Sequence, residues 1–121
     1  LLMEAVIRKD HELMSVLIRS GADVEIRDKR GWTALHFAAQ NSDELAAKLL
    51  IDAGANVNSK ESHGNNVIWR AVFDAQDGFD LLKLLLSRGA LVTEKNDRGI
   101  SAMDLAISIG DKDLIETLTT R

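Results

Sequence analysis

The sequence predicts an all-helical repeat fold, because three markers recur along its 121 residues at nearly the same spacing. A Gly-Ala pair occurs at intervals of 33 and 35 residues, at Gly21, Gly54 and Gly89. A second glycine keeps these two intervals, at Gly31, Gly64 and Gly99. Apolar triplets do the same, beginning at Val16, Leu49 and Leu84. Each unit has room for two short helices and a turn, which cannot bury an apolar face alone, so we expect the units to stack in a row.

The segment from Thr33 to Ala39, which reads TALHFAA, resembles the core motif of the ankyrin repeat, a family with a 33-residue period. The resemblance implies a solenoid of stacked helix-turn-helix units joined by short β-hairpin loops. It implies one domain over residues 1–121, with repeats at about 1–27, 28–60, 61–95 and 96–121. The first and last repeats are expected to act as caps.

The first two repeats show where their helices begin. Apolar spacing predicts an inner helix at the start of the chain and an outer helix over residues 13–18, which Asp10 caps. In the second repeat Thr33 is the expected N-cap, since its hydroxyl can accept a hydrogen bond from an exposed helix amide. We expect Leu49 to lie in the core of the second outer helix, so that truncating it is costly.

The third and fourth repeats depart from the motif. Asn66 replaces the capping threonine, which it can do chemically, and residues 74–78 form a loop two residues longer than its equivalent. An insertion there is either drift or a functional loop. In the fourth repeat Ser101 is the expected cap, and Thr117 and Thr119 make the outer helix polar, as suits a terminal repeat.

Composition limits the possible functions. There are no cysteines, and the three histidines fall at three different positions of the repeat, so no catalytic residue, metal site or cofactor is expected. The formal net charge of -4 argues against nucleic acid, and no run reaches the roughly 18 apolar residues of a membrane span. Arg27, Lys60 and Lys95 occupy equivalent positions and form a possible basic ladder for an acidic protein. We therefore expect a cytoplasmic, monomeric protein that is not an enzyme and takes no small-molecule substrate.

Two residues of the inner helices have expected structural roles. The resemblance implies that His36 links neighbouring hairpins by hydrogen bonds, a task that suits neutral imidazole. Trp69 stands at the equivalent position of the third repeat, and we expect it to be buried.

The resemblance also implies a concave binding face made of hairpins and inner helices. Its expected partner-binding residues are Lys29, Arg30, Trp32, Gln40, Asn41, His63, Asn65, Arg70, Phe73, Asp74, Arg98 and Ile100. Trp32 is either an exposed anchor for the partner or folds back on a neighbouring hairpin or on the stems of Lys29 and Arg30. The expected function is non-catalytic binding of another protein. The alternatives are a small inhibitor of the immunity-protein type, which caps a toxin or enzyme, and a regulatory region of a larger protein.

Overall fold

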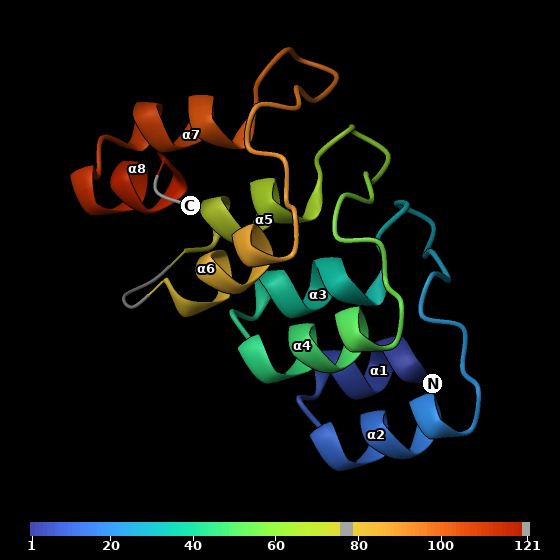
Figure 1. Cartoon of the computed structure of the whole chain (residues 1–121). Coiled ribbons are helices and arrows are strands. Elements are labelled where there is room, and N and C mark those ends of the chain that lie inside the picture. Colours follow the sequence, from blue (N-terminus) through green and yellow to red (C-terminus); the bar gives the residue numbers. More distant parts are fainter. Residues whose placement is uncertain (76–78, 120–121) are drawn as a thin grey trace.

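The computed structural model describes residues 1–75 and 79–119, and this part of the chain contains eight helices. The helices are α1 (Leu2–Ile7), α2 (His11–Arg19), α3 (Ala34–Gln40), α4 (Glu44–Asp52), α5 (Val67–Phe73), α6 (Asp80–Ser87), α7 (Ala102–Ile109) and α8 (Lys112–Thr119). Four pairs stack in a row, with α1, α3, α5 and α7 in one layer and α2, α4, α6 and α8 in the other (Figure 1). The predicted all-helical repeat architecture is confirmed.

Three long loops project from the inner layer, before α3, α5 and α7 (Figure 1). They fold back as hairpins, but in the described residues their strand pairing is limited to one antiparallel bridge, between Lys60 and Asn66. Residues 76–78 of the longer third-repeat loop lie outside the described part. The projecting hairpins and the inner helices beside them make up the surface that the family resemblance implied for binding.

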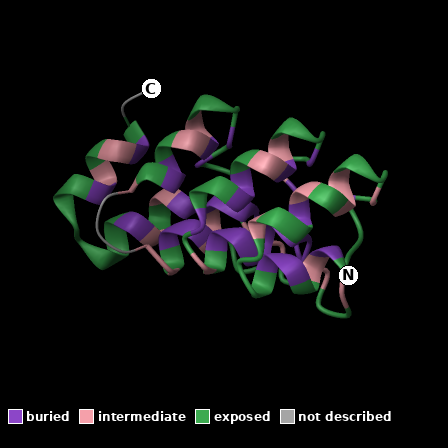
Figure 2. Cartoon of the chain, turned by 90° about the horizontal axis from the view of Figure 1, so that it is seen from below, coloured by how far each residue is buried: buried purple, intermediate pink, exposed green. Residues whose placement is uncertain are grey.

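The core lies between the two layers and between neighbouring pairs (Figure 2). Val6, Ala39 and Val72 hold equivalent positions on three inner helices and are exposed by only 0%, 0% and 1%, because the next pair covers each of them. Ile107 holds this position on α7, where none of the described helices lies beyond it, and is 58% exposed. The polar end that we expected is therefore incomplete: Thr119 is exposed, but so is this isoleucine.

Local capping follows the sequence prediction closely. The side chains of Thr33, Asn66 and Ser101 accept hydrogen bonds from the backbone N–H three residues later, at 3.4, 3.0 and 3.1 Å. Asp10 does the same for α2, at 3.1 Å. Each bond satisfies an N–H group that the helix itself leaves without a partner, which explains where these helices begin.

Neighbouring hairpins approach each other so closely that a glycine is required between them. Gly31 has a φ of +78°, and an added Cβ would lie 2.9 Å from Ser62 N. The same approach allows Ser62 N to donate to Arg30 O at 2.9 Å. One hairpin to the next, Asp97 N donates to His63 O at 3.0 Å. At Gly31 and Gly64 the recurring glycine thus reflects the close approach of the next hairpin as well as a turn, whereas at Gly99 only the turn requires it.

Truncating the outer helix of the second pair tests the register of its core. Leu50 is 0% exposed, whereas Leu49, which we expected in the core, is only half-buried. We expect Leu50→Ala to lower the free energy of unfolding by about 2–5 kcal/mol and Leu49→Ala by less. Denaturant titration of both variants measures this, and a larger loss for Leu49→Ala would contradict the observed packing.

Candidate functional site

The hairpin tips are built alike from local hydrogen bonds. In the hairpin before α3, Asp28 Oδ1 accepts from Arg30 N at 2.8 Å and from Trp32 N at 2.9 Å. In the next hairpin Glu61 Oε1 accepts from His63 N at 2.7 Å, and from the N–H two residues further on. A side-chain oxygen that ties two N–H groups of its own loop replaces a backbone turn and fixes the shape of the tip.

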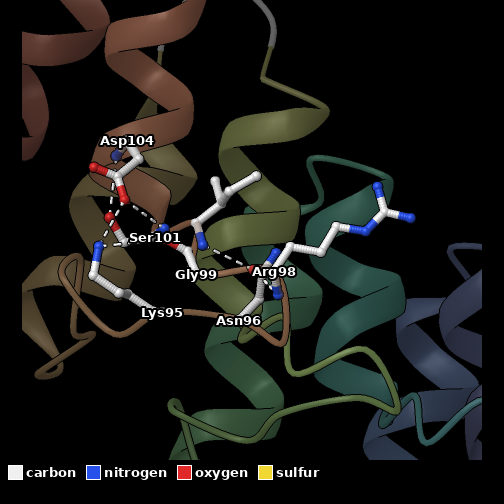
Figure 3. A network of polar contacts seen from close by, with 7 residues as sticks. Lys95, Asn96, Arg98, Gly99, Ser101 and Asp104 are labelled. Carbon is white, nitrogen blue, oxygen red and sulfur yellow. Dashed lines mark hydrogen bonds and ion pairs between the residues drawn. The ribbon is translucent and has the colours of Figure 1, made fainter.

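The hairpin before α7 repeats this arrangement, with an amide in place of the carboxylate (Figure 3). Asn96 Oδ1 accepts from the N–H groups of Arg98 and Ile100, both at 2.9 Å. Beside it, Lys95 Nζ donates to Asp104 Oδ2 at 3.2 Å and to the Gly99 carbonyl at 3.3 Å. The Arg98 side chain extends away from this network, toward solvent (Figure 3).

Arg30, His63 and Arg98 therefore occupy equivalent places on three successive tips. We call these three residues the tip row. All three are exposed, as is Lys29, and the backbone bonds between neighbouring hairpins hold the tips together. Three of the predicted partner-binding residues are thus aligned along one edge of the molecule.

Trp32 is 4% exposed, so the prediction of an exposed anchor is wrong and the alternative, that it folds back, is correct. Its ring centroid lies 4.4 Å from the Arg30 guanidinium carbon and 4.8 Å from that of Arg70, in the next repeat. The Phe37 ring lies 4.9 Å away on the same hairpin-helix unit. Trp32 joins the hairpin before α3 to α5, and the guanidinium groups of Arg30 and Arg70 both lie close to its ring.

Asn65 is also buried, at 7% exposure, although we expected it to contact a partner. It holds the position of Trp32 in the next hairpin, and its Oδ1 accepts from Asn96 Nδ2 at 2.7 Å. At the equivalent position of the last hairpin, Ile100 is 37% exposed. The following repeat covers this position, which explains why Trp32 and Asn65 are buried and Ile100 is not.

The expected basic ladder is not free to bind an acidic partner. Arg27 Nη1 donates to the carbonyls of Gly31, at 2.9 Å, and Lys60, at 2.6 Å, and so ties two hairpins together. Lys60 Nζ lies 3.5 Å from Glu94. With Lys95 bonded to Asp104, all three cations act within the fold.

Two aromatic rings and one cation form a cluster on α5. Trp69 and Phe73 are stacked, with ring centroids 5.5 Å apart and planes inclined by 10°. The Arg70 guanidinium carbon lies 5.6 and 5.0 Å from their centroids, and its Nη1 is 3.4 Å from Asp74 Oδ2. We call Trp69, Arg70 and Phe73 the aromatic cluster.

The aromatic cluster is only partly covered. Phe73 is 56% exposed, and Trp69, which we expected to be buried, is half-buried. Trp69 Nε1 and Arg70 Nε have no hydrogen-bond partner among the described residues. We did not predict from the sequence that Trp69 is partly exposed. The available signal was its spacing of four residues from Phe73, which places both rings on one side of a helix.

The two remaining predicted residues lie apart from the tips, at the far end of α3. Gln40 is exposed. Asn41 Nδ2 donates to the carbonyls of Val6 and Ile7, at 3.5 and 3.4 Å, and so serves the junction of the first two pairs. Gln40 and Asn41 thus lie at the end of α3 remote from the tips, and Phe73 and Asp74 hold the equivalent places on the adjacent α5.

His36 acts as the predicted link between repeats. It is 0% exposed, its Nδ1 accepts from Thr33 N at 3.3 Å, and its Nε2 lies 3.2 Å from the Asn65 carbonyl, to which it donates. Burial lowers the pKa of this imidazole from 6.5 to about 4. The neutral ring is therefore the form that the fold accommodates, because a proton on Nδ1 would remove the acceptor for Thr33.

His36 makes stability depend on pH. Its pKa is lower in the folded chain than in the unfolded one, so the unfolded chain takes up the proton first and stability falls as pH drops from about 6.5 toward 4. We expect the free energy of unfolding to fall by about 2 kcal/mol between pH 7 and pH 5. Urea titrations at both pH values measure this. His36→Gln should lose most of that difference, and an unchanged difference would contradict the assignment.

Trp32 and Phe73 differ in burial, so truncation separates their roles. We expect Trp32→Ala to cost about 3–5 kcal/mol, because a nearly fully buried ring is lost, and Phe73→Ala to cost far less. Thermal and denaturant unfolding of the two variants check this. Equal losses would show that Trp32 is not the structural link described above.

Residues 1–75 and 79–119 contain no group of three or more His, Asp or Glu side chains that could hold a metal ion. In the same part of the chain, no helix is long and apolar enough to cross a membrane.

Comparison with known proteins gives consistent matches. A family model described as ankyrin repeats, in three copies, matches residues 2–96. A putative ankyrin repeat protein of fowlpox virus is 27% identical over 117 residues, which are 95% of this chain and 26% of the viral protein. The E3 ubiquitin-protein ligase KEG of Arabidopsis thaliana is 34% identical over 112 residues, 88% of this chain and 7% of the ligase.

The Neurogenic locus Notch protein of Drosophila melanogaster is 32% identical over 111 residues, which are 90% of this chain and 4% of Notch. The chain therefore spans about a quarter or less of the length of these three relatives.

Proposed function

Because the chain belongs to the ankyrin-repeat family, we propose that it binds another protein through the tip row and the exposed edge of the aromatic cluster. The observation that carries this proposal is the tip row itself. The Arg30 guanidinium lies over the Trp32 ring, but its side chain is 59% exposed. The side chains of His63 and Arg98 form no hydrogen bond or ion pair among the described residues, and backbone bonds hold all three residues in line. Stacked repeats use such extended surfaces for binding.

The aromatic cluster adds the apolar part of this surface. Phe73 offers an exposed ring beside the Arg70 guanidinium, and aromatic and arginine side chains are the residues that most often dominate binding energy at interfaces. Arg30 and Arg98 have acidic neighbours at their tips, Asp28 and Asp97, so the surface carries charges of both signs. Mixed charge suits a protein surface better than a phosphate backbone.

The proposal assigns binding and no catalysis to these residues. It treats the four helix pairs as one binding unit that acts as a monomer in the cytoplasm. The proposal is tested by asking whether changes to this surface alter which protein the chain binds.

Two double variants that remove the same charge separate the tips from the outer helices. Arg30→Ser with Arg98→Ser alters the tip row, and Arg19→Ser with Lys83→Ser alters exposed residues of α2 and α6. Affinity capture from cells that make the protein, quantified by mass spectrometry, compares both with wild type. We expect at least one captured protein to fall severalfold with the tip variant only. Three identical capture profiles would contradict the proposal.

A further inference from the structure

A cavity opens where the third helix pair meets the fourth, at the end of the inner helices remote from the hairpin tips. It has a volume of about 280 Å³, and its walls include Val72, Phe73, Phe79, Ile109, Leu114 and Asp111. Two of its lining residues, Ile109 and Asp111, flank the turn between α7 and α8. Pockets for small-molecule ligands are commonly roughly 300–1,000 Å³, so this one is suited to a single large side chain.

The junction at the cavity lacks a hydrogen bond that the first junction has. Between the first and second pairs, Asn41 donates to the carbonyls of Val6 and Ile7. Ile109 holds the place of Asn41 in the fourth repeat, eight residues after the cap, and faces the equivalents of those two residues, Val72 and Phe73. An isoleucine cannot make the hydrogen bonds that close the first junction, and it is 52% exposed.

Phe79 forms another wall and has a left-handed backbone, as Lys9 and Ser42 do in the turns before α2 and α4. Its φ is 48°, in the left-handed region, which costs a bulky residue on the order of 1–3 kcal/mol. It also precedes α6 without a side-chain cap, whereas Asp10, Asp43 and Asp111 cap α2, α4 and α8. Strain and a missing cap thus coincide at one residue whose ring lines the cavity.

Acidic residues lie in the wall of the cavity and next to it in the sequence. Asp111 is part of the wall, and Asp74 and Asp80 directly follow the wall residues Phe73 and Phe79. The apolar wall residues favour an apolar side chain, and the carboxylates favour positive charge around it.

We propose that this cavity receives one apolar side chain from a basic segment of the partner polypeptide. This proposal rests on the proposed function in one respect, that the partner is a polypeptide. The cavity itself lies apart from the tip row and can be tested separately. Phe73 belongs to both surfaces, so one partner that crosses the inner face of α5 reaches the cavity and the aromatic cluster together.

The test uses three blocked hexapeptides and the full chain, labelled for methyl NMR. The first peptide is Lys-Lys-Phe-Leu-Lys-Lys, the second has Glu in place of each Lys, and the third has Ser in place of Phe and Leu. We expect the first to shift the Ile109 methyl signals and to bind at least tenfold more tightly than the other two. Absence of binding, or equal binding of the acidic or the serine peptide, would overturn the proposal.

Two matched variants locate the binding. Ile109→Lys and Ile107→Lys change exposed isoleucines two residues apart on α7, and only Ile109 lines the cavity. We expect Ile109→Lys to weaken the first peptide at least tenfold, Ile107→Lys to leave it within twofold, and Asp80→Asn to weaken it severalfold. Equal effects of the two isoleucine variants would overturn the site. These titrations need no natural partner, so their failure leaves the capture experiment with the tip variants standing, and the reverse also holds.

Discussion

Each helix pair has an apolar side that only the next pair can cover, and the rest of the structure depends on this stacking contact. Val6, Ala39 and Val72 are buried by it, whereas Ile107 at the same position is not. Alanines at 0% exposure, such as Ala38 and Ala47, keep the pairs close. Close stacking sets the spacing of the hairpins, and that spacing allows the backbone bonds that align the tip row.

Features decided within a few residues of sequence could be predicted. The capping roles of Thr33, Asn66 and Ser101 involve a side chain and an N–H group three residues later, so the local sequence contains the whole interaction. The burial of Trp32 and Asn65 could not be predicted in this way. Each is covered by a repeat whose contacting residues lie about 30 to 40 positions further along the chain, and no local pattern reports that contact.

The candidate site shows the same division. The family resemblance placed Arg30, His63 and Arg98 on a binding face; all three are exposed in the structure, and their contact with a partner stays a prediction. The stacked pair of Trp69 and Phe73 was visible only as a spacing of four, which is as common in a core as on a surface. The cavity is lined by residues of α5, α7 and α8 and by Phe79, which are far apart in the sequence, so no local pattern predicts it.

The helices make their principal contacts with their own partner and with the adjacent pairs. A row of this kind has consequences for how the chain reaches its folded state. Contacts between neighbouring units need only short loops to close, so little chain entropy is lost before each contact forms. Folding can begin at any unit and spread in both directions, with every completed unit serving as the template for the next.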